Sequence, residues 1–440
     1  MTDWREEYQR RFISAEEAAK LVKSGDRIVF TMGREAHGVG LAIAARKGEL
    51  ENVRVFIPTP SYDFGWYDEG WQDSFDIAIT MPTGTAQEAV DARRVDVIPG
   101  VALSMYRASS FAMTADVVLT EVSPPDDKGF CSFGQSLWNK TKQIRMGKLV
   151  IAEVNRNLIR TYGNNFIHVS EIDYFVEHLS AGGEPGKGSL AGRALKEPEP
   201  YLKNIAGYVN RLIEDGDTIQ IGVGRTTEPL VRLGMLDNKH DIGIHSEATP
   251  PGIITLVKEG VITGEYKTIN PGRVTVTSLG GGSKEEMAWA DDNPLFELVD
   301  IDYLEDIRVI ASHDNMVAIN NALAIDLQGQ ISAESLGGRQ FSATGGQFPF
   351  VVGALLSKGG RSITLLPSTA RGGEVSRIMP RLPEGTLTTI PHGCADYIAT
   401  EFGAIRLWGK SLRERADALI SIAHPDFRAE LKEEAGKMFG

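Results

Sequence analysis

The chain has 440 residues, of which 42% are hydrophobic and 24% charged, and its formal net charge is −13. This length predicts two or three globular domains, and the negative charge argues against nucleic acid or an anionic membrane as a partner. No run of about 18 apolar residues occurs, and the polar N-terminus lacks the apolar core of a signal peptide, so we expect a cytoplasmic protein without a membrane span. The two cysteines, Cys131 and Cys394, have no metal-ligand spacing and no HExxH pattern occurs, so no metal site is expected.

Helical and strand-like segments alternate along the chain. The first helical pattern begins at Ser14, which forms the S-x-x-E pattern of a capping box with Glu17, and it ends at the turn Gly25-Asp26. Strand-like segments that are apolar almost throughout are typical of a sheet covered by helices on both faces, which predicts the α/β class. They lie at 27–33, 53–58, 115–122, 149–155, 218–224, 241–247, 273–278, 307–313, 316–320 and 362–368.

Two pairs of segments indicate an internal repeat. Residues 18–33 resemble residues 209–224, because each reads helix, Gly-Asp turn, strand and glycine. Further along, residues 126–134 resemble residues 326–334 at a similar separation. Two halves of similar topology would explain both pairs, although helix, Gly-Asp and strand is also a common local solution that arises by chance.

A segment between the two halves has the composition of a linker. Residues 180–200 are rich in Gly, Pro and charge and poor in large apolar side chains. We therefore predict two related open-sheet α/β domains, residues 1–190 and 200–440, with the active site in a cleft between them.

Three loops carry residues that are suited to bind an anion. The turn at 221–229, IGVGRTTEP, is a weak dinucleotide fingerprint because Thr227 replaces the third glycine, but such a turn still brings backbone N–H groups close to an anion. The loop at 342–350, SATGGQFPF, precedes an apolar helix-like stretch. The loop at 368–382 carries three arginines and is either a solvated basic loop or a pocket for phosphate or carboxylate.

Glu247 ends the strand-like run DIGIHSE and is followed closely by two prolines. In a parallel sheet successive strand ends line one edge, so we expect Gly222, Gly224 and Glu247 to converge there. A carboxylate at such an edge can act as a general base or as a nucleophile, whereas an isolated glutamate is ordinarily a surface or capping residue. No GxSxG pattern competes for the role of nucleophile.

The chain resembles a known family. GIHSE, the GGQ loop, SKGGRSITLLPSTARGGEVSRI and TEFGAIRLWGKSLRERADALISIAHPDFR together are similar to the acetyl-CoA hydrolase/transferase family, whose members include class I CoA-transferases such as 4-hydroxybutyrate CoA-transferase. The match is densest between Gly216 and Leu431 and looser in the N-terminal half. The resemblance implies the CoA-transferase fold, a homodimer or tetramer, and an enzyme that transfers coenzyme A from an acyl-CoA to a small carboxylic acid.

The resemblance also implies a ping-pong mechanism. Glu247 would attack the thioester carbonyl to form an acyl-glutamyl anhydride, and the CoA thiolate would then convert it to a glutamyl-CoA thioester and the free acid. Gly345 and Gly346 would be the oxyanion donors, with Gln347 as a neighbouring substrate contact. The residues expected to contact CoA are Gly222, Val223, Gly224, Arg225, Thr226, Asn320 and Arg371. The expected acyl pocket residues are Met32, His37 and Tyr62, with core packing as the alternative for Met32.

Three positions depart from the family pattern near the expected acyl pocket. Pro349 replaces an aspartate, Phe402 a tyrosine and Ala248 a methionine. The loss of polar groups favours a more apolar or differently shaped acid, so the departures bear on the substrate more than on the chemistry. Two alternatives stay open: an acyl-CoA hydrolase that uses the same glutamate, and a catalytically inactive CoA-binding protein.

Overall fold

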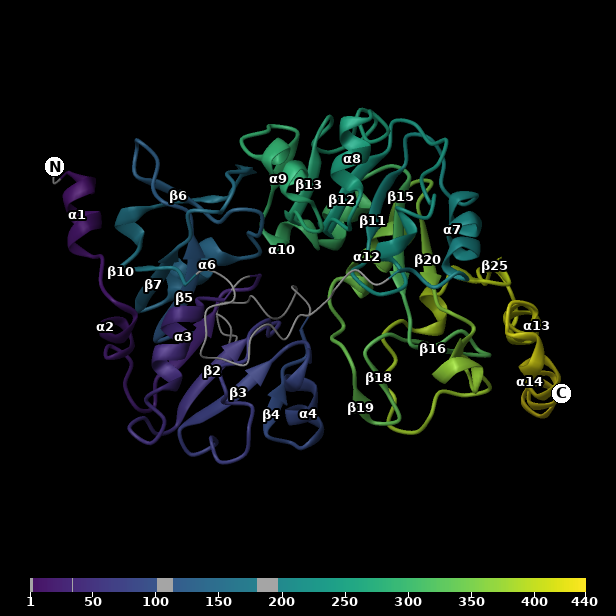
Figure 1. The fold of residues 1–440 in the computed structure, drawn as a ribbon. Helices are drawn as coiled ribbons and strands as arrows, with labels where there is room; N and C mark the ends of the chain where they lie inside the picture. The colour runs from purple at the N-terminus through teal and green to yellow at the C-terminus, as the bar shows by residue number, and fades with distance from the viewer. Residues whose placement is uncertain (1–2, 34, 101–113, 180–196) are drawn as a thin grey trace. The chain divides into compact units, whose positions relative to one another are not determined.

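The computed structural model describes residues 3–33, 35–100, 114–179 and 197–440 (Figure 1). The chain divides into two compact units, Met1–Ala194 with Met287–Asp302, and Leu195–Glu286 with Tyr303–Gly440. Each unit contains a mainly parallel sheet with helices packed on it, which confirms the predicted α/β class. The predicted linker at 180–200 lies almost wholly outside the described residues.

The first unit is built on a parallel sheet with the strand order β10-β7-β5-β1-β2-β3-β4. Its strands are β1 (Arg27–Phe30), β2 (Val53–Ile57), β3 (Phe75–Ile79), β4 (Val95–Val97), β5 (Val117–Val122), β7 (Leu149–Val154) and β10 (Tyr174–Glu177), with the shorter β6 (Phe130–Ser132), β8 (Tyr162–Gly163), β9 (Phe166–His168) and β14 (Phe296–Leu298) outside it. Its helices are α1 (Trp4–Arg10), α2 (Ala15–Ala19), α3 (His37–Ala44), α4 (Thr85–Asp91) and α6 (Lys140–Met146), with a 3-10 turn η2 (Val169–Glu171). Two further helices, α9 (Lys284–Ala290) and α10 (Ile301–Leu304), include the positions where the chain passes from one unit to the other.

Within the second unit the strand order is β25-β24-β20-β15-β11-β12-β13, parallel except for the hairpin of β24 and β25. These strands are β11 (Thr218–Ile221), β12 (Gly243–Ala248), β13 (Val274–Ser278), β15 (Met316–Asn321), β20 (Arg361–Leu365), β24 (Tyr397–Thr400) and β25 (Gly403–Arg406). Seven short strands form small accessory ladders: β16 (Ala324–Asp326), β17 (Ile331–Ser332), β18 (Ser335–Leu336), β19 (Arg339–Gln340), β21 (Thr369–Ala370), β22 (Val375–Ser376) and β23 (Ile378–Met379), which pairs with β16.

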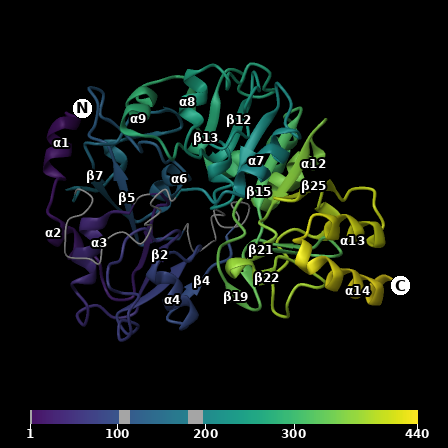
Figure 2. The same ribbon diagram turned by 45° about the vertical axis from the view of Figure 1, so that its right-hand side comes forward.

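The helices of the second unit pack mainly on its sheet and on each other. They are α7 (Leu202–Asn210), α8 (Ile253–Lys258), α11 (Ile307–Ala311), α12 (Gln347–Leu356), α13 (Leu412–Ser421) and α14 (Arg428–Phe439), with 3-10 turns η3 (Glu228–Leu230), η4 (Arg371–Gly373), η5 (His392–Cys394) and η6 (Pro425–Phe427). Helix α12 packs on β15 and β20, and α7 packs on β24 and β25. The C-terminal pair α13 and α14 lies side by side, as Figure 2 shows in yellow.

The sequence predicted most strands of the two main sheets, and one predicted strand, at 307–313, is a helix. The capping box at Ser14 and Glu17 is present in both directions, as predicted. Residues 307–313, predicted as a strand, instead form helix α11, because the Asp306 side chain accepts a hydrogen bond from the Arg308 N–H and caps the helix. A short apolar run does not extend over enough residues for its hydrophobic periodicity to distinguish a helix from a strand. The capping interaction of Asp306 therefore determines that this run is a helix.

The first pair of the internal repeat has the same local structure in both units. Gly25 and Gly216 both have positive φ, +81° and +77°, which a residue with a side chain rarely adopts. The aspartates that follow them, Asp26 and Asp217, accept a hydrogen bond from the backbone N–H three residues earlier. Each turn therefore leads into a central strand, β1 or β11, by the same geometry.

The second pair is equally close. Asp126 accepts hydrogen bonds from the N–H groups two and four residues later, and so does Asp326. Gly129 and Gly329 have φ values of +88° and +95°. Since both pairs share hydrogen bonds as well as sequence, and both sheets have the same order of corresponding strands, the repeat is confirmed.

Candidate active site

Glu247 lies near the carboxyl end of β12, at the edge of the second unit's sheet. Strand β12 pairs with β11 in parallel, with Ile219 opposite Ile244. The Ser246 hydroxyl donates to the Ile221 carbonyl and accepts from the Ile221 N–H, which fixes the register up to the end of both strands. The glycine turn that follows β11 therefore starts beside Glu247, as the sequence predicted from strand ends alone.

The Glu247 side chain contacts the first turn of helix α12 and a second glutamate. The Gly346 N–H donates a hydrogen bond to the Glu247 carboxylate, and the Glu305 side chain is hydrogen-bonded to it as well. A Cβ placed on Gly346 would lie 2.6 Å from Glu247 Oε2 and 2.7 Å from Glu305 Oε1. Only glycine allows the backbone of residue 346 to approach both carboxyl groups this closely.

The electrostatic setting of Glu247 combines burial with donors. Burial raises its pKa above the ordinary glutamate value of 4.5, while the hydrogen bonds with Glu305 and the Gly346 N–H oppose that shift. Gly346 is the N-cap of α12, so the positive end of the helix dipole also faces the carboxylate. Burial thus weakens the solvation of this carboxylate, and few protein donors replace the lost water.

Two buried histidines lie behind Glu247 on the same side of the sheet. His245 Nε2 lies 2.9 Å from the Leu304 carbonyl and therefore donates to it, which ties β12 to the residue before Glu305. Burial, with the nearby His313 and Lys267, lowers the pKa of His245 well below its ordinary value, so it is neutral. Burial also lowers the pKa of His313 to about 4. Neither imidazole is charged near neutral pH.

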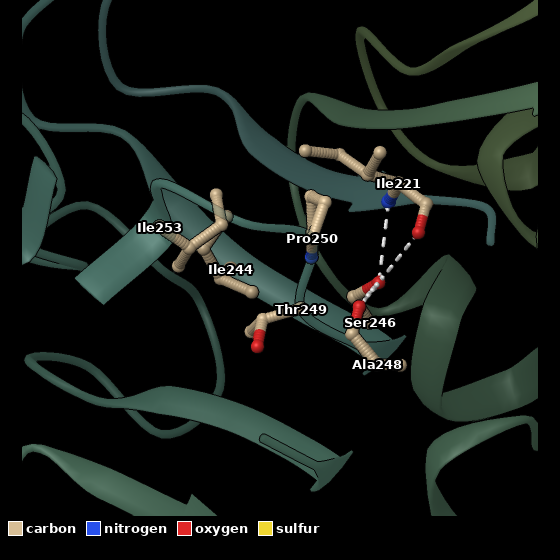
Figure 3. Close-up of a pocket in the computed structure, with 7 residues that line it drawn as sticks. All are labelled: Ile221, Ile244, Ser246, Ala248, Thr249, Pro250 and Ile253. Carbon is tan, nitrogen blue, oxygen red and sulfur yellow. Dashed lines mark hydrogen bonds between the residues drawn. The ribbon is translucent and has the colours of Figure 1, made fainter. Parts of the chain in front are cut away.

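The opposite face of β12 is packed with apolar side chains (Figure 3). Alternate residues Ile244, Ser246 and Ala248 point to that face together with Ile221 and Ile253, and the hollow among them has no room for a water molecule. Glu247 does not line this hollow. The chemistry of β12 is therefore restricted to the face that carries His245 and Glu247.

The glycine turn after β11 packs tightly on the asparagines of β15. A Cβ on Gly222 would lie 2.5 Å from Asn320 Oδ1, and one on Gly224 would lie 2.4 Å from Asn321 Oδ1. The Thr227 hydroxyl, at the position of the missing third glycine, donates to the Gly222 carbonyl and closes the turn. The turn exposes the side chains of Val223 and Arg225 and half-buries that of Thr226.

Asn320 makes a reciprocal amide pair that the sequence did not predict. Its Nδ2 donates to Gln220 Oε1 and its Oδ1 accepts from Gln220 Nε2, both at 3.0 Å. Both residues are buried. The Asn320 amide therefore has a structural partner on β11, and its predicted contact with CoA stays a prediction.

The same edge of the sheet carries a second carboxylate, Glu401, after β24. The Ser368 N–H and hydroxyl, at the end of β20, donate to its two oxygens at 2.9 and 2.6 Å. Arg371 lies nearby in sequence, exposed at the tip of the β21–β22 hairpin with a positive φ of 52°. Arg377, by contrast, donates to the carbonyls of Leu323 and Thr369, which gives it a structural role.

The residues after Gly346 form the N-terminus of α12. Gln347 is 8% exposed, and its Nε2 has no hydrogen-bond partner in the part of the chain that the structure describes. Pro349 is the third residue of the helix, where the missing N–H costs no intrahelical bond. The proline that replaces the family's aspartate therefore leaves the helix and its glycine N-cap intact.

The three predicted acyl pocket residues belong to the first unit. His37 and Tyr62 lie together, with ring centroids 4.4 Å apart, and Tyr62 is buried. Met32 is half-buried in the loop after β1. The predicted cleft between the domains stays a prediction.

The sequence reasoning missed Glu305, Gln220 and Glu401. Glu305 is 2% exposed and lies between α10 and α11, far from Glu247 in the sequence. No local pattern marks it. Gln220 offers a weak signal, since a polar residue inside an apolar central strand needs a buried partner.

The described residues contain neither a membrane-spanning helix nor a metal-binding group. Within them, no helix is long and apolar enough to cross a membrane. No group of three or more His, Cys, Asp or Glu side chains in those segments could hold a metal ion. The predicted cytoplasmic location and homo-oligomeric state stay predictions.

Comparison with family models matches both halves of the chain. Residues 1–181 match the acetyl-CoA hydrolase/transferase N-terminal domain, and residues 282–435 match the C-terminal domain of the same family. A 4-hydroxybutyrate coenzyme A transferase of Clostridium kluyveri is 39% identical over 99% of this chain and 100% of its own. A butyryl-CoA:acetate CoA-transferase of Anaerostipes caccae is 34% identical over 99% of this chain and 98% of its own.

A solved structure is similar along its full length. RipA from Yersinia pestis superimposes with a TM-score of 0.87 and 31% identity, covering 100% of both chains. These matches confirm the predicted fold, and the two family domains cover residues 1–181 and 282–435. The chain therefore belongs to the acetyl-CoA hydrolase/transferase family, as the sequence predicted, and is an enzyme of the CoA-transferase class.

Proposed function

We propose that the chain transfers coenzyme A between an acyl-CoA and a small carboxylic acid by a ping-pong mechanism with Glu247 as the nucleophile. The observation that carries the proposal is the position of Glu247, poorly solvated at the carboxyl edge of the sheet and in contact with the Gly346 N–H. A carboxylate is a weak nucleophile in water, so removal of water and fixed orientation are what it needs to attack a thioester.

In the first half of the reaction a Glu247 oxygen attacks the thioester carbonyl carbon. A carbon–oxygen bond forms, the carbon–sulfur bond breaks and its electron pair leaves with the CoA thiolate. The product is an anhydride between the acyl group and Glu247. The Gly345 N–H and the unpartnered Nε2 of Gln347 are the donors we propose for the oxyanion and the substrate oxygens in this step.

In the next step the thiolate attacks the Glu247 carbonyl carbon of the anhydride. The negative charge then develops on a Glu247 oxygen itself, and the carboxylate of the free acid leaves. The Gly346 N–H already donates to the Glu247 carboxylate, so it is placed to stabilise that oxyanion without reorganisation. A second acid reverses both steps and leaves as its CoA thioester.

The exposed turn after β11 and the hairpin tip supply the groups proposed to bind CoA. The main-chain N–H groups of Gly222–Thr226 and the side chains of Arg225 and Arg371 suit its phosphates, because amides and guanidinium groups are good phosphate donors. His37 and Tyr62, stacked in the first unit, are the proposed contacts for the acyl group, together with Met32. The names of the relatives favour a short-chain monocarboxylic acid as substrate.

A trapping experiment tests the proposal. The purified chain is incubated with butyryl-CoA, treated with borohydride or hydroxylamine, digested and analysed by mass spectrometry. A CoA thioester at Glu247, converted to the alcohol or hydroxamate, is the expected result. Glu247→Gln should give no adduct, while the exposed Glu259→Gln, a matched control, should behave as the parent. An unmodified Glu247 peptide in the parent would overturn the assignment of the nucleophile.

The same preparation separates transfer from hydrolysis. Free thiol is followed with and without acetate as acceptor, and the acyl-CoA products are identified by mass. Transfer predicts acetyl-CoA formation that requires acetate and little net release of thiol. Thiol release that is independent of acetate would instead identify a hydrolase.

A further inference from the structure

The strongest feature outside the predicted site is the second carboxyl group beside Glu247. Glu305 is 2% exposed, its side chain is hydrogen-bonded to that of Glu247, and both converge on the Cα of Gly346. A hydrogen bond between two carboxyl groups requires a proton on one of them. Two carboxyl groups that are in contact and largely removed from water cannot both carry charge, so the pair shares one proton near neutral pH.

The surroundings decide which carboxyl group carries the charge. Glu247 accepts the Gly346 N–H at the N-terminus of α12, which favours its ionised form. Glu247 is also half-buried, whereas Glu305 is almost fully buried. Burial away from solvent penalises the charged form more strongly at Glu305 than at Glu247, so the shared proton is on Glu305.

The other titratable groups near the pair do not supply a positive charge that would stabilise an ionised Glu305. On β12, His245 is neutral because burial lowers its pKa, and burial also lowers the pKa of His313, whose ring centroid lies 4.6 Å from that of His245. The adjacent Asp306 is ion-paired with Arg308. The Lys267 ammonium donates to the Arg273 carbonyl and the Thr275 hydroxyl.

We propose that Glu305 is a protonated hydrogen-bond donor to Glu247, which orients the nucleophile and keeps the single negative charge on it. The proposal rests on the proposed role of Glu247 as nucleophile. Glu305 keeps its proton throughout: Glu247 alone supplies the electron pair that attacks the thioester. When the thiolate later attacks the glutamyl carbonyl, the same O–H donates to the oxygen on which charge develops, beside the Gly346 N–H.

His245 has a supporting part in this arrangement. Its Nε2–H donates to the Leu304 carbonyl, so the strand that carries Glu247 also holds the backbone next to Glu305. This hydrogen bond therefore restricts the movement of Glu247 relative to Glu305.

The pH profile of kcat/KM for butyryl-CoA with acetate tests the proposal on three variants. Glu305→Gln keeps a donor but cannot ionise, so it should retain activity within about tenfold of the parent and lose the alkaline decline that arises when Glu305 deprotonates. Glu305→Leu removes the donor and should lower kcat/KM by about 10² to 10³-fold at every pH. Asp306→Asn, which keeps a helix-capping side chain next door, is the matched control and should leave the profile unchanged.

Two outcomes would overturn the role of Glu305. One is equal loss of activity in Glu305→Gln and Glu305→Leu with both variants folded by circular dichroism; the other is an unaltered alkaline decline in Glu305→Gln. Should Glu305→Leu fail to fold, the comparison of Glu305→Gln with the parent still decides. Trapping of the Glu247 thioester in the parent distinguishes the role of Glu305 from the role of Glu247. If no adduct forms, the assignment of Glu247 as the nucleophile is refuted. If the adduct forms but the pH profile of Glu305→Gln is unaltered, only the role of Glu305 is refuted.

Discussion

Gly346 is the residue at which a single methyl group should cost most of the activity. A Cβ at this position would lie 2.6 Å from Glu247 Oε2 and 2.7 Å from both Glu247 Cδ and Glu305 Oε1, whereas ordinary contacts begin at 3.4 Å. In Gly346→Ala the carboxyl groups must therefore move by about 0.8 Å. A misplacement of about 1 Å in a reacting group can cost about 10²-fold in rate, which is the loss of kcat/KM expected here.

The backbone of Gly346 is not itself a source of strain, which makes the substitution informative. Its φ of −80° suits alanine. Gly345, its neighbour, offers the converse: φ is +54° and nothing lies within 4 Å of a Cβ, so Gly345→Ala should lose about 1 kcal/mol of stability through backbone strain. Gly207→Ala, in the middle of α7 with open space around it, should gain about 0.5–1 kcal/mol and leave kcat/KM unchanged.

The measurement is kcat/KM for butyryl-CoA with acetate, beside thermal unfolding of the three variants. We expect Gly346→Ala to unfold near the parent's temperature while its kcat falls and its CoA adduct forms slowly. Parental kcat/KM in Gly346→Ala, with a normal unfolding temperature, would refute the argument that residue 346 must be bare for Glu247 to reach its position.

Three further predictions concern the rest of the site. Because burial raises the pKa of Glu247, and the ionised form attacks, kcat/KM should fall as pH drops through a value above the ordinary 4.5, measured by initial rates. The same raised pKa predicts that ionisation of Glu247 lowers the free energy of unfolding as pH rises through that value, and Glu247→Gln should lack this loss in urea unfolding. In Gly224→Ala the Cβ would lie 2.4 Å from Asn321 Oδ1, so the turn or the Asn321 side chain must shift. Where the turn shifts, KM for acyl-CoA should rise several-fold with a smaller change in kcat, measured by initial rates. Asn320→Leu leaves the buried Gln220 amide unpaired and should cost about 1–3 kcal/mol in urea unfolding, part of which the double variant with Gln220→Leu should recover.

The placement of Glu247 could be predicted because it depends on a simple rule of parallel sheets. The apolar run before it fixes a buried strand, the glycine turn at Gly222 fixes the end of another, and neighbouring parallel strands end at one edge. The same rule extends to Glu401, which follows β24, although nothing in the sequence alone says that β24 joins this sheet. Local pattern predicted the strands, and the repeat predicted two halves of similar topology.

Glu305 could not be predicted because its partner is set by tertiary packing. It follows the short helix α10, in a stretch where residues 307–313 read as a strand from their composition. The capping interaction of Asp306 turns that run into α11, and only then does Glu305 reach Gly346. The wrong prediction of a strand at 307–313 is thus the reason why the contact of Glu305 with Glu247 was not predicted.

The first unit shows what a buried carboxylate looks like when it serves structure. At the carboxyl ends of β5 and β7, Glu121 accepts from Asn155 Nδ2 at 2.6 Å, and Glu153 accepts from the Val39 N–H and from His178 Nδ1, both at 2.7 Å. His178 Nε2 also lies 3.4 Å from Glu121, so the imidazole bridges the two carboxylates. Both glutamates are therefore held by donors on several elements and have little reason to react.

Glu247 differs from these glutamates in what surrounds it rather than in its place in the fold. The strand register that puts Glu247 near the end of β12 puts Pro58 at the matching point after β2, so only one copy of the repeat carries a glutamate at this point. In that copy the Glu247 carboxylate contacts Gly346 and the Glu305 carboxyl group, whereas a histidine and an amide side chain hold Glu121 and Glu153. The contacts that the described residues make with Glu247 therefore differ from those that hold Glu121 and Glu153, and this difference fits the nucleophilic role that we propose for Glu247 alone.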